Sequence, residues 1–417
     1  MTYSLFCRVL ISTREGYVIV GVNGRIFLKW GGRLGQQDMI YLDHAATSWP
    51  KAPGVADAMV EILNGPSASA GRGNHGMALQ AGRTMFTTRT RLAKLFRISN
   101  PNDIAFTSNT TEALNLAIKG YVKPGDHVIA TMVEHNSVRR PLEFLKRTNG
   151  ISVDYLPISE QGDISLEELE KTFRPQTKLV VCSHSSNLLG SILPIAEISK
   201  LAHAHGAVVL LDAAQTAGLY PIDVGSMGID MLAFPGHKGL LGPQGTGGLY
   251  ISPKLDLEPL LHGGTGSQSE EPEQPLVRPD RYEAGTSNTV GVAGLGAAVK
   301  YVMEQGVERI YEHEWNLTQT IMRELKGIPG ISLLGPNIGQ PRTGLVSFNA
   351  QGHDAAEMAF NLDRDFGIAV RAGYHCTPLG HKTAGTSSGG AVRASVGHTT
   401  TEEEIEALIT AVRLIVK

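Results

Sequence analysis

The chain has no excess of charge of either sign and no long apolar run. Its 37 basic and 40 acidic residues leave a formal net charge of -3, so it lacks the basic footprint by which proteins bind nucleic acid or an anionic membrane surface. No apolar run approaches the roughly 18 residues of a membrane span, and the first residues lack the basic and apolar regions of a signal peptide. We therefore expect a small-molecule partner, no nucleic acid and no membrane.

Cysteine and nucleotide-binding motifs are also scarce. The three cysteines, Cys7, Cys182 and Cys376, form an odd and widely spaced set without a C-x-x-C pair. Such a set excludes a disulfide framework and is typical of a protein of the reducing cytoplasm. A G-x-x-x-x-G-K-[ST] phosphate loop is absent, and the segment 294–299 lacks the third glycine of a dinucleotide-binding fingerprint.

The chain does have length and a regular alternation of segments. Its 417 residues exceed the roughly 250 to 300 residues at which a single hydrophobic core stops growing, so we expect two domains. From residue 103 onward strand-like and helix-like segments alternate, which predicts a mostly parallel sheet with crossover helices. The expected strands are 104–107, 128–132, 153–156, 179–183, 208–211, 231–234 and 248–251. The expected helices are 111–119, 138–147, 195–205 and one that opens at Ser165.

These segments predict an α/β protein. We expect a large three-layer domain over 55–300, around a mainly parallel sheet, and a smaller α+β domain over 301–417. The smaller domain is expected to contain strands at 345–348 and 368–371 and a final helix over 402–416, whose apolar residues recur at helical spacing.

The first part of the chain is divided at residue 39. Residues 39–54 are expected to pack on the smaller domain. The status of residues 1–38 stays open between an alternative start at Met39 and an appended hairpin that turns at Asn23-Gly24.

The first candidate site joins Asp212 and Lys238. Asp212 ends an apolar strand and precedes the lysine by 238 − 212 = 26 residues. Pyridoxal 5'-phosphate (PLP) needs an amine to hold its aldehyde as a Schiff base and a carboxylate to keep its pyridine nitrogen protonated, and this pair supplies both. Glycines at 236, 239 and 242 let the backbone approach a ligand closely. The alternative is a solvated lysine and a turn aspartate, for which those glycines would serve no purpose.

Polar side chains follow several of the other expected strands. Thr110 and Thr111 join a strand to a helix, where hydroxyls and free N–H groups can cradle a phosphate; an ordinary helix cap is the alternative. Asn187 and His135 also follow strands, at the edge where parallel sheets bind ligands. A turn asparagine and a hydrogen-bonded structural histidine are the alternatives for these two.

Cys376 lies between a histidine and a stretch rich in proline and glycine. Its polar neighbours predict an exposed, thiolate-prone cysteine on a mobile loop, and a buried inert cysteine is the alternative. A zinc site of His375, Cys376 and His381 lacks a second paired motif, so we expect no metal.

With these residues in place, the chain resembles the class V aminotransferase family, and within it the type II members of the cysteine desulfurase and selenocysteine lyase group. The resemblance runs from about Tyr41 to Val412 and implies the PLP-dependent transferase fold type I. It rests on the segments Tyr41-Leu42-Asp43-His44-Ala45-Ala46-Thr47, Glu134-His135-Asn136, Ser183-His184-Ser185-Ser186-Asn187, Asp212-Ala213-Ala214-Gln215, Gly236-His237-Lys238, Glu283-Ala284-Gly285-Thr286 and Arg371-Ala372-Gly373-Tyr374-His375-Cys376.

The resemblance implies a role for each matching residue. Lys238 is the implied Schiff-base lysine, Asp212 the partner of the pyridine nitrogen, and His135 the histidine stacked on the ring. The residues implied to approach the phenolic oxygen are Asn187 and Gln215. Those implied to hold the phosphate are Thr110, Thr111 and His237, with Thr286 from the second subunit of a homodimer. Those implied to bind the substrate are Arg393, Arg371 and Asn187.

The implied activity is that of a cysteine desulfurase, which converts L-cysteine to L-alanine and leaves the sulfur on Cys376 as a persulfide for a sulfur-acceptor protein. Two features depart from the familiar type II pattern: Pro235, where many relatives have a hydroxyl residue, and the segment 376–393. A selenocysteine lyase or an aminotransferase on the same scaffold is one alternative. A non-catalytic protein that binds PLP or a protein partner is another.

Overall fold

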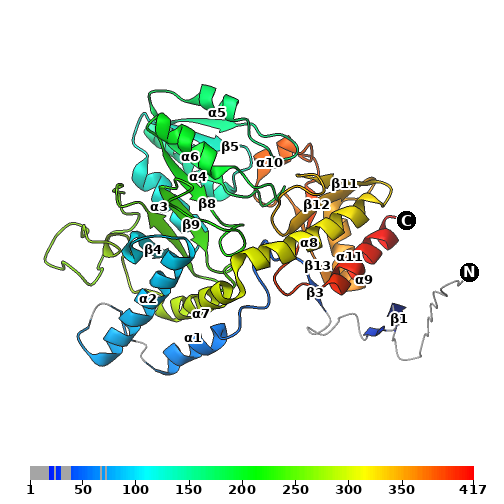
Figure 1. The fold of residues 1–417 in the computed structure, drawn as a ribbon, viewed down its shortest axis with the longest axis horizontal. Coiled ribbons are helices and arrows are strands. Elements are labelled where there is room, and N and C mark those ends of the chain that lie inside the picture. Colours follow the sequence, from blue (N-terminus) through cyan, green and yellow to red (C-terminus); the bar gives the residue numbers. More distant parts are fainter. Residues whose placement is uncertain (1–17, 23–24, 30–38, 66–67, 71–72) are drawn as a thin grey trace, which may run out of the picture.

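The largest sheet of the protein has seven strands. The structure is a computed structural model that describes residues 18–22, 25–29, 39–65, 68–70 and 73–417. The strand order in the sheet is β4-β10-β9-β8-β7-β5-β6 (Figure 1). The strands are β4 (Ile104–Thr107), β5 (His127–Thr131), β6 (Ser152–Leu156), β7 (Thr177–Ser183), β8 (Val208–Asp212), β9 (Met231–Pro235) and β10 (Gly247–Ile251). Strand β10 alone runs opposite to the other six strands, so the predicted, mainly parallel sheet is confirmed.

Helices cover both faces of this sheet because its strands are apolar on both sides. On β8, Val209 and Leu211 belong to one hydrophobic core and Leu210 to the other, as the two-residue period of a strand requires. The helices on the first face are α2 (Gly76–Leu95), α5 (Leu166–Thr172), α6 (Ile195–Ala204) and α7 (Thr289–Gln305), and those on the second are α3 (Thr110–Tyr121) and α4 (Asn136–Asn149). The expected three-layer architecture is therefore present. None of the described helices is long and apolar enough to cross a membrane.

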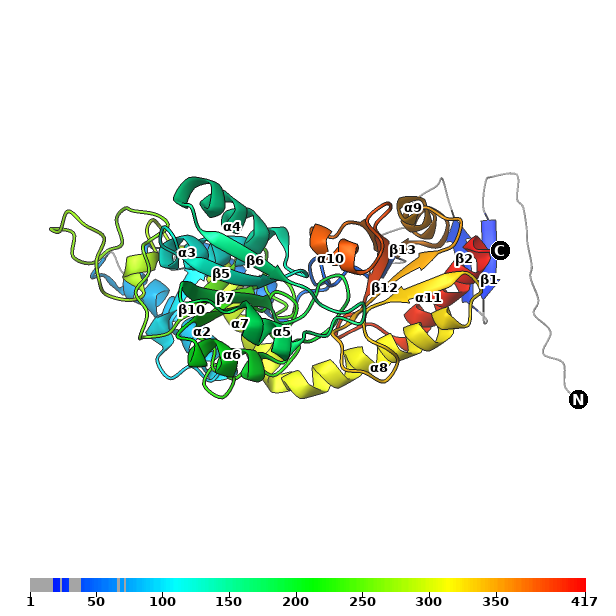
Figure 2. The ribbon, with the colours of Figure 1, turned by 90° about the horizontal axis from the view of Figure 1, so that it is seen from above.

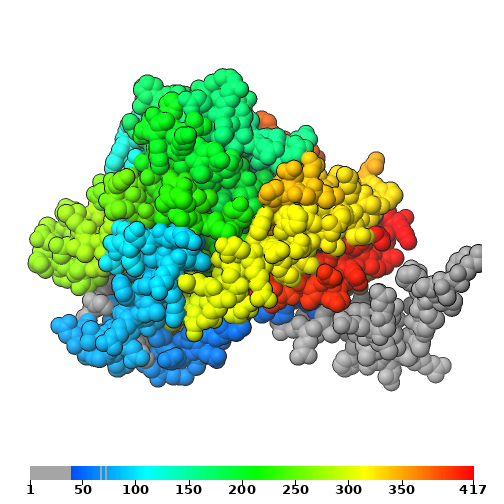
Figure 3. Space-filling view, viewed as in Figure 1, coloured from blue at the N-terminus to red at the C-terminus, as the bar shows by residue number. Residues whose placement is uncertain are grey.

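A second, four-stranded antiparallel sheet forms the C-terminal part, in the order β11-β12-β15-β14. The strands are β11 (Ile331–Leu334), β12 (Leu345–Ala350), β14 (Arg371–Gly373) and β15 (Ala391–Ser395). The helices that share its core are α8 (Val307–Lys326), α9 (Ala355–Phe366) and α11 (Glu402–Ile415). Figure 2 shows α8 running from the large sheet to the smaller one, and Figure 3 shows it on the surface beside α11. Helix α1 (Val55–Asn64) packs on α7 at the start of α8.

The segment before α1 connects the two sheets. β3 (Ile40–Tyr41) pairs in parallel with β13 (Ile368–Ala369), and Leu42 lies in the core of the smaller sheet. Further along, the N–H of Ser48 donates to the carbonyl of His237, which follows β9. The domain boundaries that we expected at residues 54 and 300 stay predictions.

One expected strand is wrong in its extent. Residues 368–371 were expected to form a single strand, but β13 pairs with β3, whereas β14 joins the four-stranded sheet. The chain thus changes sheets at Val370. An apolar run does not encode the sheet that each of its halves will join, because pairing partners are chosen by tertiary packing.

The hairpin expected near the start of the chain lies only partly among the described residues. β1 (Val18–Val22) pairs antiparallel with β2 (Arg25–Lys29). The turn residues Asn23 and Gly24 lie outside the described residues, and the status of residues 1–38 stays a prediction.

A carboxyl group is buried where α8 passes the large sheet. Glu314 is 3% exposed and, with Gln215 and Lys238, lines a cavity of about 20 Å³, which is enough for one water. Gly344 leaves it room, since a Cβ at that residue would lie 2.3 Å from Glu314 Oε2. Burial raises the pKa of Glu314 to about 8.

We predict that Glu314→Gln stabilises the protein increasingly as the pH rises. Between about pH 4.5 and 8 the unfolded chain ionises Glu314 while the folded chain keeps the proton, so wild-type stability falls by up to about 1.4 kcal/mol per pH unit. The amide keeps the shape of the side chain but does not titrate. The gain in Tm over wild type should be small at about pH 5 and largest at about pH 8. Equal gains at both pH values would contradict a buried neutral carboxyl group.

Candidate active site

Lys238 lies in a tight loop after β9, in the middle of the protein. The loop is closed by hydrogen bonds from Gly236 N to Thr246 O (2.8 Å) and from Gly242 N to Gly236 O (2.7 Å). Glycine is required at residue 236, because a Cβ there would lie 2.1 Å from the hydroxyl of Thr246. Burial, followed by the charge of Arg393, lowers the pKa of Lys238 to about 8. The amine is therefore easier to deprotonate than an ordinary lysine.

Asp212 faces the same region from the end of the neighbouring strand β8. Its carboxylate is 3% exposed and accepts a hydrogen bond of 2.9 Å from Ala214 N. Burial raises the pKa of Asp212, and the positive charge of Lys238 opposes that rise. The structure thus brings together the two residues that the sequence paired, at the carboxyl edge of the sheet.

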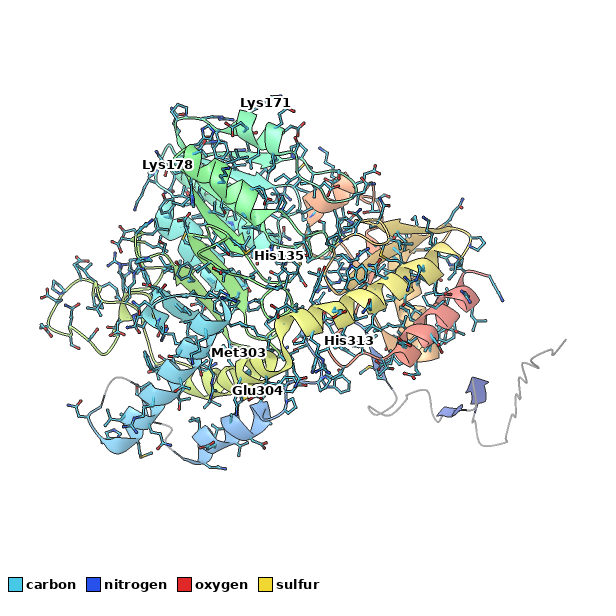
Figure 4. All side chains as sticks on the ribbon, in the orientation of Figure 1. His135, Lys171, Lys178, Met303, Glu304 and His313 are labelled. Carbon is cyan, nitrogen blue, oxygen red and sulfur yellow. The ribbon has the colours of Figure 1, made fainter. Side chains whose placement is uncertain are left out.

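His135 caps the N-terminus of α4, four residues after the end of β5. Its Nδ1 accepts a hydrogen bond of 3.1 Å from Ser137 N, which leaves Nε2 as the protonated nitrogen of the neutral ring. Burial, and then the charge of Lys238, lower the pKa of His135 to about 4. Figure 4 shows His135 near the middle of the molecule, and the effect of the Lys238 charge on its pKa indicates that the two residues lie near each other.

The smaller sheet contributes two arginines. Arg393 on β15 is 1% exposed; its Nη2 donates to Asp43 Oδ1 (2.9 Å) and its Nη1 to the carbonyl of Asn187 (2.9 Å). Its Nε has no hydrogen-bond partner among the described residues. Arg371 lies opposite it on β14, and both arginines lower the pKa of Lys238. The site can therefore bind a carboxylate.

Asn187 connects the large sheet with the loop that carries Cys376. Its Nδ2 donates to the carbonyl of His375 (2.6 Å), and its Oδ1 accepts from the hydroxyl of Thr377 (2.5 Å). Asn136 N, at the start of α4, donates to the carbonyl of Cys376 (2.8 Å). His375 and Cys376 have φ angles of 46° and 58°. This left-handed conformation is energetically unfavourable for residues other than glycine, so the contacts with Asn187 and Asn136 are needed to maintain it.

Two polar neighbours of Cys376 are buried, contrary to our expectation, whereas Lys382, Ser387 and Ser388 are exposed. His375 is 3% exposed and His381, on α10 (Pro378–Thr383), is 0% exposed. Their rings stack with centroids 5.9 Å apart, and His375 Nε2 donates to the carbonyl of Ala391 (3.0 Å). Cys376 itself is half-buried. The loop is therefore anchored on both sides, and within the described residues no group of three His, Cys, Asp or Glu side chains could hold a metal ion.

The residues expected to hold a phosphate differ in exposure. Thr110 is buried and Thr111 is exposed at the start of α3, where Asn109 Oδ1 caps the helix by accepting from Glu112 N (3.0 Å). Thr286 is exposed, and no contact among the described residues places it against Lys238.

His237 and Gln215 complete the set of expected residues. The carbonyl of His237 accepts from Ser48 N (2.9 Å) and its Nδ1 is buried without a partner among the described residues. Burial lowers the pKa of His237 to about 4. Gln215 is buried and its Nε2 donates to the carbonyl of Ala45 (3.1 Å).

Several residues of the site were missed. Lys51 donates from Nζ to the His237 carbonyl (3.0 Å), and burial lowers the pKa of Lys51 to about 8. Glu134, next to His135, accepts from Ser183 N and Ser183 Oγ (2.9 Å each), and burial raises the pKa of Glu134 to about 7. The motif Glu134-His135-Asn136 contained Glu134 without a role for it, and Lys51 lies four residues beyond the motif that ends at Thr47.

The fold and the site define an α/β protein that holds a lysine and a carboxylate at the carboxyl edge of a mainly parallel sheet. The profile of the aminotransferase class-V family matches residues 40–408. The chain belongs to this family, and the resemblance stated above is confirmed.

Relatives and solved structures agree with this assignment. The chain is 38% identical over 379 residues to a probable cysteine desulfurase of Methanothermobacter thermautotrophicus, covering 89% of this chain and 93% of the relative. It is 36% identical over 388 residues to a cysteine desulfurase of Escherichia coli K12, covering 90% and 93%. The apo cysteine desulfurase of Thermococcus onnurineus superposes with a TM-score of 0.86 at 33% identity, over 91% and 95% of the two chains. CsdA of Escherichia coli, in its S-sulfonic acid form, gives 0.82 at 28% identity, over 91% and 94%.

We predict that Asn187→Ala speeds the alkylation of Cys376. The substitution removes two side-chain hydrogen bonds from a loop held in an unfavourable conformation, each worth about 1 kcal/mol, so iodoacetamide should react several-fold to about tenfold faster. The measurement uses a Cys7→Ser background, in which Cys182 is buried. Thr377→Ser keeps the hydroxyl and serves as the control. An unchanged alkylation rate in Asn187→Ala would show that these bonds do not restrain the loop.

Proposed function

We propose that the protein is a PLP-dependent cysteine desulfurase, which converts L-cysteine to L-alanine and transfers the sulfur to Cys376 as a persulfide. The proposal is supported by three groups that lie close together. Lys238 has a lowered pKa, to which the charge of Arg393 contributes. Asn187 accepts a hydrogen bond from the buried Arg393 at its carbonyl and donates one to the Cys376 loop from its side chain. The names of the curated relatives support the same activity.

The residues present fit the cofactor. Lys238 would hold its aldehyde, Asp212 its pyridine nitrogen, and His135 the face of its ring. Asn187 and Gln215 would approach the phenolic oxygen, and the phosphate would be held by Thr110, Thr111 and His237. The buried Nδ1 of His237, which lacks a partner among the described residues, supports this assignment. When bound, PLP supplies the electron sink for the reaction.

The substrate carboxylate would bind at Arg393 and Arg371. Two of the Arg393 nitrogens already donate to Asp43 and Asn187, while Nε has no partner among the described residues. Arg371, on the adjacent strand, supplies further donors. Charge-assisted hydrogen bonds of this kind fix the orientation of a carboxylate.

Lys238 and Cys376 would then act in turn. The freed amine of Lys238 removes the substrate α-proton, which its lowered pKa favours. The Cys376 thiolate attacks the substrate sulfur, so that a sulfur–sulfur bond forms as the carbon–sulfur bond breaks and its electrons return to carbon. Protonation and release of alanine leave the persulfide on Cys376 for an acceptor thiol.

The proposal extends to the state of the protein in the cell. We place it in the cytoplasm, which its unpaired Cys182 and Cys376 support. It would act as a homodimer, because Thr286 is exposed in one chain and would complete the phosphate site of the other. A sulfur-acceptor protein would take the persulfide.

We predict that Cys376→Ala abolishes sulfur transfer without loss of cofactor. With L-cysteine, PLP and dithiothreitol, the wild type should form sulfide and alanine in equal amounts, and the variant should form at least about 100-fold less of both because the nucleophile is gone. Its visible cofactor absorption should remain, whereas Lys238→Ala should alter it. Cys7→Ser, outside the family match, is the control. Alanine formation at the wild-type rate in Cys376→Ala would exclude the proposed step.

We predict that the apoprotein captures PLP faster as the pH rises towards 8. Only the neutral amine attacks an aldehyde, and its fraction grows up to the pKa of Lys238, which is about 8. Removing the charge of Arg393 should raise that pKa, so Arg393→Met should shift the midpoint of the rate profile to higher pH. Stopped-flow absorbance measures both profiles. A midpoint that moves to lower pH in Arg393→Met would show that another group controls the reaction.

A further inference from the structure

A groove runs along the outer face of α4, beside the Cys376 loop. It encloses about 480 Å³. Six of its lining residues belong to α4, namely Asn136, Arg139, Arg140, Glu143, Phe144 and Arg147. Their spacing of three, four, seven, eight and eleven residues from the first places them on one face of the helix. Pro378, at the start of α10, lines the other side.

The groove is basic. None of its three arginines forms an ion pair with a described residue. Glu143 accepts a hydrogen bond of 2.9 Å from the hydroxyl of Tyr155. Phe144 is 43% exposed, and Lys119 Nζ and the Arg147 guanidinium lie 5.1 and 5.7 Å from its ring centre. The face therefore offers positive charge around an exposed aromatic ring.

The groove begins at the loop that holds the reactive sulfur. Asn136, its first residue, donates its N–H to the carbonyl of Cys376 (2.8 Å), and Pro378 follows Cys376 by two residues. Arg147 lies eleven residues further along the helix, which is about 16 Å at 1.5 Å per residue. A ligand that fills the groove would span from the loop that carries Cys376 to the far end of the groove at Arg147.

We propose that this groove docks the persulfide acceptor, and that the acceptor is a polypeptide segment whose cysteine is flanked by acidic residues. The inference rests on the proposed desulfurase function. A small thiol is too short to reach Arg147 from Cys376, whereas an extended segment of a few residues covers that distance. Carboxylates complement the arginines, and an exposed aromatic ring among arginines is typical of an interface hot spot.

Glu143 argues against an RNA strand as the occupant. Its carboxylate lies in the middle of the lining face, where a continuous phosphate backbone would be repelled. A peptide can place a neutral residue at that point and acidic residues at the arginines.

The transfer step balances without an added oxidant or reductant. The acceptor thiolate attacks the outer sulfur of the Cys376 persulfide and forms a new sulfur–sulfur bond. The bond between Cys376 Sγ and the outer sulfur breaks, and Sγ leaves as a thiolate. The acceptor then holds the persulfide, and Cys376 is ready for another turnover.

The first experiment measures docking alone. A fluorescent synthetic peptide, with serine in place of the cysteine and glutamates on both sides, is titrated with the holoenzyme and followed by anisotropy. It should bind at least about tenfold more tightly than matched peptides with glutamine or lysine in place of glutamate, and the affinity should fall as salt is added. Equal affinity for the glutamate and glutamine peptides would overturn the proposal.

The second experiment tests the groove with matched variants. Arg147→Glu and Phe144→Ser should each weaken binding of the glutamate peptide, the charge reversal by at least about tenfold. Arg309→Glu makes the same charge change at an exposed residue of α8 and should leave binding unchanged. An equal effect of the two charge reversals would overturn the proposal. A changed oligomeric mass of the Arg147→Glu variant would also overturn it, because the groove would then be a contact between copies of this chain. Displacement of the peptide by a more tightly bound single-stranded RNA would overturn it as well.

Turnover separates this inference from the proposed function. With dithiothreitol as acceptor, alanine formation from L-cysteine reports the desulfurase activity; with the cysteine form of the glutamate peptide, it reports transfer through the groove. Arg147→Glu should lose the second activity at least about tenfold more than the first. Equal losses of both would overturn the docking role. Absence of alanine with dithiothreitol in the wild type would refute the proposed function, while peptide binding would still decide whether the groove takes an acidic segment.

Discussion

One buried guanidinium holds the site together. Arg393 is 1% exposed on a strand of the smaller sheet, and it donates to Asp43 in the N-terminal segment and to the carbonyl of Asn187 at the edge of the large sheet. A buried charge is tolerated only where such partners are present. Because Arg393 and its two partners come from three distant parts of the chain, the site exists only when the two sheets and the N-terminal segment are packed together.

Burial keeps the histidines around this arginine uncharged. His135 and His237 have pKa values lowered to about 4, and His375 to about 3, with burial as the largest cause in each case. Near neutral pH these imidazoles are therefore uncharged, and the positive charge of the region resides on Arg371, Arg393, Lys51 and Lys238. This arrangement favours an anionic ligand inside the site, and the basic face of α4 extends the same field outward from the Cys376 loop.

Much of the site could be predicted because its residues follow apolar strands. Asp212, His135 and Asn187 were found in this way, since the carboxyl ends of parallel strands share one edge of a sheet. Helix α8 was not predicted, although its apolar residues Leu317, Ile321 and Leu325 recur at helical spacing. The burial of His375 and His381 was not predicted either, because polar residues are ordinarily exposed and only contacts with distant segments remove these rings from solvent.

The sequence by itself determined the order of strands and helices, the mainly parallel sheet, the family and the strand-end residues, because apolar periodicity and short motifs are local properties of the chain. Tertiary structure alone decided that Arg371 faces Arg393, that Asn187 restrains the Cys376 loop, and that Glu314 is buried behind Lys238. These contacts join residues far apart in the chain. The pKa shifts that depend on them follow from burial and from neighbouring charges, which no local pattern encodes.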